Sequence, residues 1–196
     1  ALARALADAE EKGTLPKAVI LVNLYGQSCD MDRLLPLCER YGIPVLEDAA
    51  ESMGARYKDK ISGSFGRFGF YSFNGNKIIT TSGGGMLLSD GEEDIATARF
   101  WAPLARDKAP WYQHSELGYN FRMSNELAGI GRGQMNMLQK SVLASVAVFD
   151  RYKAALVSFP VVCFMPEPDW SYSNRWLTTF TINAAYSSAT PRDLIA

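Results

Sequence analysis

The sequence predicts an α/β protein built on a mainly parallel sheet. Two short runs, residues 18–24 and 43–46, have the length of strands and are apolar at successive positions, which is typical of strands buried on both faces. A segment with apolar residues at helical spacing lies between them. Strand, helix and strand with short joints form a βαβ unit, which requires parallel pairing and a right-handed crossover.

The helix between these strands is expected to begin after Asp30, whose side chain can cap its N-terminus, and to end before Gly42. Pro36 lies inside this helix, at a cost of about 3 kcal/mol unless the helix kinks there. An earlier helix over residues 2–9 is expected to stop at Gly13. These helices and the two strands form the first part of the predicted fold.

The middle of the sequence predicts three strands, one helix and one long loop. Strands are expected at 55–57, 68–73 and 86–89, and a helix at 92–101. Residues 102–118 are rich in proline and aromatic residues and have no periodicity, so they predict a long loop. Long loops in compact domains are generally functional or disordered.

The last third of the sequence predicts one long helix and a second, smaller unit. Ser124 can cap the helix, whose apolar positions continue to about Val157. Strands are expected at 161–164 and 176–182, joined through a proline-rich segment and a Ser-Tyr-Ser turn at 171–173.

The composition excludes several classes of protein. The chain has 196 residues, 47% of them hydrophobic, which argues against a disordered protein. Its 20 Lys and Arg against 21 Asp and Glu lack the basic surplus of a nucleic-acid binder, and no apolar run approaches the roughly 18 residues of a membrane span. Three cysteines and one histidine show no metal-ligand spacing, so no metal site is expected and a reducing, cytoplasmic setting is predicted.

Asp48 is the first candidate for chemistry. It stands at the carboxyl end of a predicted parallel strand, where open α/β sheets place their ligands. A carboxylate at this position can pair with a protonated ring nitrogen. The alternative is that Asp48 only caps the turn formed by the next two alanines.

Lys77 is the second candidate, because it lies between an apolar strand and an apolar segment. Such a position suits a Schiff-base lysine, and the alternative is a lysine on a surface loop. Ser72 offers a hydroxyl group at the end of the strand, and the glycines at 83–85 offer a flexible turn. The glycine run alone is a weak phosphate signal because it lacks the P-loop pattern.

The third candidate segment, residues 118–125, joins the long loop to the N-terminus of the long helix, a position that favours anions. Asn120 offers a neutral donor and Arg122 a planar cation, both suited to phosphate. The alternative is a helix cap followed by a surface arginine.

Five segments occur in a fixed order: 24–27 with 30–32, 47–52, 72–77, 83–85 and 118–122. Together they resemble the sugar aminotransferases of the DegT/DnrJ/StrS type, which are fold-type I pyridoxal phosphate enzymes. The Ser-Phe-Asn-Gly-Asn-Lys form of 72–77, with residues 173–178, is most similar to the branch that aminates C4 of UDP-linked 4-keto-6-deoxy sugars in bacillosamine pathways.

The resemblance implies an aspartate-aminotransferase-like fold with a particular division of the chain. Residues 1–123 would form part of the large domain that binds pyridoxal phosphate, 124–157 a long connecting helix, and 158–196 the start of a small α+β domain. Members of this family are about twice as long, so the resemblance implies that the sequence is a fragment.

The resemblance also implies roles for single residues. Lys77 would form the Schiff base with the cofactor and carry the proton to and from the substrate carbon. Asp48 would pair with the protonated pyridine nitrogen, Glu51 would lie near the ring hydroxyl, and Ser72 would bind the cofactor phosphate. Asn120 would reach the phosphate in the neighbouring subunit of a homodimer.

Arg122 is a further, substrate or interface, candidate. The implied function, in polysaccharide biosynthesis, is transfer of an amino group from glutamate to a nucleotide-linked keto sugar. The alternatives are a 3-keto-sugar or cyclitol aminotransferase of the same family and a non-catalytic remnant with the fold only. Three residues depart from the family pattern: Asn23 replaces a histidine, Arg67 replaces an aspartate, and Pro36 is unexpected in its helix.

Overall fold

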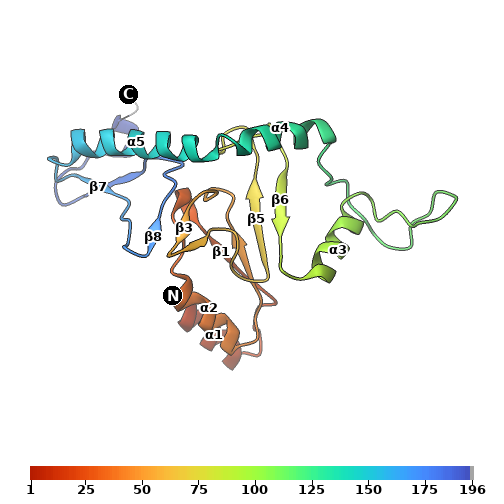
Figure 1. The fold of residues 1–196 in the computed structure, drawn as a ribbon. Helices are drawn as coiled ribbons and strands as arrows, with labels where there is room; N and C mark the ends of the chain where they lie inside the picture. Colours follow the sequence, from red (N-terminus) through yellow and green to blue (C-terminus); the bar gives the residue numbers. More distant parts are fainter. Residues whose placement is uncertain (195–196) are drawn as a thin grey trace.

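A computed structural model, which describes residues 1–194, confirms the α/β fold. Its main sheet has the strand order β1-β2-β5-β6, with β1, β2 and β5 parallel and β6 antiparallel to β5 (Figure 1). The strands are β1 (Val19–Val22), β2 (Val45–Asp48), β5 (Phe68–Ser72) and β6 (Gly85–Leu88). In this register Asp48 lies between Val22 of β1 and Phe70 of β5.

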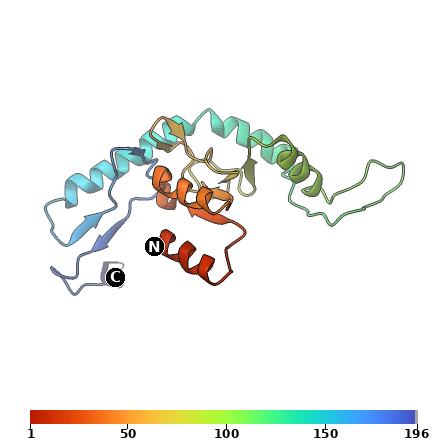
Figure 2. The same ribbon diagram turned by 90° about the horizontal axis from the view of Figure 1, so that it is seen from below.

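Two helices, α1 (Leu2–Glu11) and α2 (Met31–Arg40), lie side by side next to the sheet (Figures 1 and 2). The expected βαβ unit is therefore present, and α2 continues through Pro36. Asp30 directly precedes α2 as expected, but the expected cap is wrong: its side chain makes no capping hydrogen bond and only a 3.9 Å ion pair with Arg33. Its Oδ1 accepts a hydrogen bond of 3.1 Å from the Tyr57 hydroxyl group instead, because that phenol is almost buried and needs an acceptor.

The expectation that the first strand is buried on both faces is half wrong. Leu21 faces inward and packs with Met31 and Cys38 of α2. Ile20 and Val22 point the other way and are 58% and 46% exposed. β1 is an edge strand of the sheet, and no described element covers its outer face.

A second, three-stranded sheet joins distant parts of the chain. It consists of β4 (Lys60–Ile61), β3 (Arg56–Tyr57) and β8 (Ser171–Tyr172), all antiparallel. The Ser-Tyr-Ser turn expected at 171–173 is therefore wrong for its first two residues. Their partner strand lies far earlier in the sequence, and a local pattern cannot reveal such pairing.

The expected helix at 92–101 is confirmed as α3 (Glu92–Trp101). The loop that follows projects from the body of the molecule in both ribbon views (Figures 1 and 2). Its base is closed by backbone bonds from Leu104 N to Tyr119 O at 2.7 Å and from Phe121 N to Ala102 O at 2.9 Å. The expected loop over 102–118 is therefore present, and backbone hydrogen bonds hold its two ends together.

The single long helix expected after Ser124 is wrong. Two helices, α4 (Asn125–Met135) and α5 (Leu138–Leu156), follow each other along the top of Figure 1. The expected cap is confirmed, since Ser124 Oγ accepts a 3.3 Å bond from Leu127 N. Three glycines in α4 raise the entropic cost of helix, and its last turn tightens through a 2.9 Å bond from Met137 N to Gln134 O.

The last hairpin pairs β7 (Val162–Phe164) with β9 (Phe180–Ile182) in antiparallel fashion. The strand expected at 161–164 is confirmed, whereas the one expected at 176–182 is shorter. Residues 173–176 form a turn held by side chains instead, in which Ser173 Oγ accepts a 3.1 Å bond from Arg175 N and Asn174 Oδ1 a 2.9 Å bond from Trp176 N. Within residues 1–194, no helix combines the length and the apolar character needed to cross a membrane.

Candidate active site

Lys77 lies in the loop that follows β5, and its amine is enclosed by residues from two other segments. Only 12% of its side chain is exposed. The Nζ atom lies 3.5 Å from Glu51 Oε1 and 4.2 Å from the centroid of the Trp176 ring. The alternative of an ordinary surface lysine does not describe this environment.

Glu51 follows β2 and is tied down by a second bond. Its Oε2 accepts a 2.8 Å hydrogen bond from Tyr25 N, in a turn where Tyr25 has a φ of 56°. One carboxylate oxygen thus holds the turn after β1, and the other faces Lys77. The structure brings these two candidates together.

Asp48 ends β2, as expected, and its carboxylate caps the next turn. Its Oδ1 accepts a 3.0 Å hydrogen bond from Ala50 N. Its main-chain oxygen accepts a 3.0 Å bond from Asn23 N, so the ends of β1 and β2 are held together. The capping alternative is therefore observed, and it occupies only part of the hydrogen-bonding capacity of the carboxylate.

Ser72 ends β5 and is half-buried, and its Oγ accepts a 3.3 Å bond from Asn74 N. Its hydroxyl proton stays available for an anion. Asn120 and Arg122 are exposed beyond the base of the loop, where Asn120 forms an isolated bridge with Pro103. These two residues take no part in the contacts of Lys77 described above.

A buried polar cluster lies directly beside Asp48 and was not predicted from the sequence. Glu47 is fully buried and accepts hydrogen bonds from Asn23 Nδ2 at 2.7 Å, Ser62 Oγ at 3.2 Å and Phe65 N at 2.7 Å. A buried carboxylate without such bonds would cost several kcal/mol. The signal in the sequence was a charged residue at an inward position of an otherwise apolar strand.

The two departures from the family pattern near the site have structural explanations. Asn23 uses both ends of its amide, donating to Glu47 and accepting a 3.0 Å bond from Cys29 N. Arg67 forms two hydrogen bonds with Asp94 in α3, at 2.6 and 2.8 Å, and this guanidinium holds the pKa of Asp94 below its ordinary value. Among the described residues, neither side chain forms a hydrogen bond or an ion pair with Lys77.

The buried cluster also shapes the titration of Tyr71. Its hydroxyl group donates to Ser62 O, and burial, with Glu47 nearby, raises its pKa to about 12. The folded pKa lies above the unfolded value of about 10, so this group's contribution to stability is complete below pH 10 and is lost as the pH rises toward 12.

We expect Tyr71→Phe to remove this alkaline loss, which is on the order of 1 kcal/mol between about pH 9 and about pH 11 for a pKa raised from about 10 to about 12. The free energy of unfolding in urea, measured at about pH 9 and about pH 11, gives the loss for each protein. Equal losses in the wild type and the variant would contradict the assignment.

A separate cavity of about 890 Å³ lies between the sheet and helices α4 and α5. Its lining is mostly apolar and includes Tyr71, Phe73, Met123, Met135 and Leu138. The lining does not contain Lys77, Asp48 or Glu51, so the cavity is separate from the candidate site residues.

The chain thus combines a mainly parallel α/β sheet, a carboxylate at the end of β2 and an enclosed lysine in the loop after β5. A solved aminotransferase from Brucella abortus has the same fold, with a TM-score of 0.81 and 28% identity over 90% of this chain and 47% of that one. The chain belongs to the DegT/DnrJ/EryC1/StrS aminotransferase family, whose model matches residues 3–196. This confirms the resemblance and the fold class expected from the sequence.

Two curated relatives show how similar the chain is in sequence to other members of the family. EpsN of Bacillus subtilis (strain 168), a pyridoxal phosphate-dependent aminotransferase by name, is 57% identical over 195 residues, which are 100% of this chain and 50% of EpsN. GDP-perosamine synthase of Caulobacter vibrioides is 40% identical over 140 residues, 71% of this chain and 38% of that protein. The chain thus spans half or less of the length of these relatives.

Proposed function

We propose that this protein acts as a pyridoxal phosphate-dependent aminotransferase that transfers an amino group from glutamate to a nucleotide-linked keto sugar. The observation that carries the proposal is the enclosed amine of Lys77, held against Glu51 and Trp176. The name of EpsN supports the cofactor. The name of GDP-perosamine synthase, which refers to a GDP-linked compound, supports a nucleotide-linked acceptor.

The residues present fit the cofactor by their chemistry. Lys77 offers an amine for covalent attachment, and Asp48 keeps spare acceptor capacity for a protonated ring nitrogen. Ser72 keeps a hydroxyl proton for a phosphate, and Glu51 is an acceptor fixed beside the amine. When bound, pyridoxal phosphate supplies an electron sink for negative charge that develops on a substrate carbon.

The residues of the chain would supply binding and proton transfer. Asp48 would keep the ring nitrogen protonated, because a carboxylate favours the charged form of a neighbouring base. Lys77 would move the proton at the substrate carbon, and Glu51 would stabilise its ammonium form from 3.5 Å. Trp176 would keep water from the amine.

The test is attachment of the cofactor to the purified protein. After incubation with pyridoxal phosphate and reduction with borohydride, we expect the pyridoxyl mass on the peptide that contains residue 77. A protein that takes up no cofactor would sink the proposal and leave a non-catalytic remnant of the fold.

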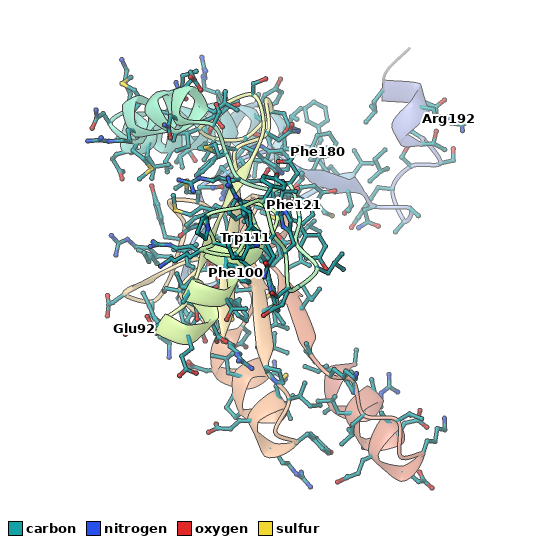
Figure 3. The ribbon with its side chains drawn as sticks, turned by 90° about the vertical axis from the view of Figure 1, so that its right-hand side faces the viewer. Glu92, Phe100, Trp111, Phe121, Phe180 and Arg192 are labelled. Carbon is teal, nitrogen blue, oxygen red and sulfur yellow. The ribbon has the colours of Figure 1, made fainter. Side chains whose placement is uncertain are left out.

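We also propose that the site is built between two copies of the chain. Asn120 would reach the cofactor phosphate of the partner, and Arg122 would contact the substrate or the interface. The loop next to Asn120 exposes several large side chains, including Trp111 and Phe121, which lie at the front of Figure 3. Apolar surface of this kind favours association.

A homodimer is therefore the expected state in solution. Light scattering over a series of micromolar concentrations should give the mass of two chains. The variant Trp111→Ser is expected to lower the dimer fraction without changing the circular dichroism spectrum. The mass of one chain throughout the series would contradict the shared site.

We propose in addition a division of the chain into domains and a location in the cytoplasm. Residues 1–123 would belong to a large cofactor-binding domain, 124–157 would connect, and 158–196 would begin a small domain whose last two residues lie outside the described part of the chain. The cysteines, all within residues 1–194, carry free thiols, as a reducing cytoplasm would maintain.

A further inference from the structure

The turn held by side chains at Ser173–Trp176 brings the C-terminal part of the chain to the Lys77 loop. Ser173, Asn174 and Arg175 are each at least nine-tenths buried. Arg175 has a φ of 50°, a left-handed conformation that non-glycine residues seldom adopt. Buried polar residues in a strained turn need compensating contacts, and these contacts show what the turn holds in place.

Asn174 fastens the turn to the segment that carries Glu51. Its Nδ2 donates to the main-chain oxygens of Glu51 and Met53, both at 2.9 Å. A Cβ atom at Gly26 would lie 1.8 Å from Asn174 Oδ1, so only glycine permits this approach. The amide therefore fits between the turn after β1 and the turn after β2.

Arg175 fastens the other side of the turn to α5 and to the segment that follows β7. Its guanidinium lies 2.6 Å from a carboxylate oxygen of Glu167 and 3.7 Å from the centroid of the Phe149 ring. The charged pair is desolvated on the arginine side, where only 5% of the side chain is exposed. The turn is thus held from both sides.

Trp176 follows directly and is fixed at both its backbone and its ring. Its N–H donates to Asn174 Oδ1 at 2.9 Å, and its indole Nε1 donates to Asn76 O at 2.7 Å. The second bond leads to the residue before Lys77. With both bonds made, the face of the indole lies against the Lys77 amine, 4.2 Å from the ring centroid.

We infer that Trp176 is a positioning residue, which holds the Lys77 amine in place through its ring and the Lys77 loop through its indole N–H. The inference rests on the proposed function, since it names what sets the position of the proposed attachment lysine. An ammonium group over an indole face is attracted by the ring quadrupole and is covered from water at the same time. Asn174 acts one step further away, by setting the backbone of Trp176.

Two variants and one matched control test the inference. Trp176→Leu removes both the ring and its N–H, whereas Trp176→Phe keeps an aromatic face and loses the bond to Asn76. The control Trp170→Leu removes a tryptophan from the same part of the chain. Trp170 packs on Tyr57, with ring centroids 4.9 Å apart, and makes no contact with Lys77 among the described residues. Urea unfolding of each variant gives its loss of stability.

The first readout needs no cofactor. Acetylation of each lysine by acetic anhydride is followed by mass spectrometry, with exposed Lys12 and Lys140 as internal standards. We expect Trp176→Leu to raise the relative rate at Lys77 by about tenfold, Trp176→Phe to raise it less, and Trp170→Leu to leave it unchanged. Unchanged acetylation in both Trp176 variants, or an equal rise in the Trp170 control, would overturn the inference.

The second readout is borohydride trapping of pyridoxal phosphate on Lys77 at limiting cofactor. Trapping should fall several-fold in Trp176→Leu and recover in part in Trp176→Phe. A wild type that traps no cofactor would sink the proposed function and leave the acetylation result to decide the role of Trp176. If Trp176→Leu does not fold, Trp176→Phe is still expected to raise the acetylation of Lys77, and the Trp170 control is still expected to leave it unchanged.

Discussion

Lys77→Ala is expected to abolish the borohydride-stable attachment of pyridoxal phosphate and to lower amino transfer by on the order of 10⁴-fold or more. The amine of Lys77 is the enclosed nucleophile of the site, and alanine offers no group to replace it. The variant should still fold, because Glu51 keeps its 2.8 Å bond from Tyr25 N when the lysine is removed. Peptide mapping after reduction measures the attachment.

Lys77→Arg is the matched control for the same experiment. A guanidinium retains the positive charge between Glu51 and Trp176 but forms no Schiff base, so stability should match the wild type while the attachment is lost. A pyridoxyl mass on another lysine of the Lys77→Ala protein, such as Lys58 or Lys60, would show that the assignment of Lys77 is wrong.

Asp48→Asn should leave the fold intact and reduce amino transfer by on the order of a hundredfold or more, with the larger loss in kcat. The side-chain oxygen of asparagine can still accept the 3.0 Å bond from Ala50 N, so the turn after β2 persists. A neutral amide cannot keep a ring nitrogen protonated, so the electron sink weakens. Steady-state kinetics of the complete enzyme with glutamate and a keto sugar nucleotide measure the effect.

Asp48→Ala separates the structural from the chemical role of this carboxylate. It removes the cap as well as the charge, so it should lose about 1 kcal/mol of stability that Asp48→Asn keeps. The two variants should be equally slow in amino transfer. Turnover of Asp48→Asn at the wild-type rate would show that the carboxylate does not serve the ring nitrogen.

The elements that the sequence predicts well are those set by local pattern. The parallel strands around α2 follow from two apolar runs and the helix between them, and Ser124 identifies the start of α4. Aspartate is a common helix cap, but the carboxylate of Asp30 accepts a hydrogen bond from the hydroxyl group of Tyr57, which lies far away in the sequence. Capping propensity is local, and competition from a distant donor is not visible in a short window.

The residues of the candidate site also differ in how far the sequence predicts them. Asp48 is placed correctly at a strand end, and Lys77 is correctly separated from the solvent-exposed lysines. Trp176 lies 100 residues from its acceptor at Asn76, so no spacing rule connects the two. Glu47 was missed because it adjoins Asp48, and the argument from strand ends favours the last carboxylate over the buried one.

The turn at Ser173–Trp176 also constrains how the molecule folds. Asn174 closes a loop of 123 residues when it bonds to Glu51 O, and contacts of such sequence separation cost loop entropy before they contribute any stability. We therefore expect the contacts around the Lys77 amine to form late in folding, after the sheet. A ligand that binds Lys77 only when these contacts are made would bind the folded chain and not the unfolded one, so occupancy at Lys77 and docking of the C-terminal segment would be thermodynamically linked.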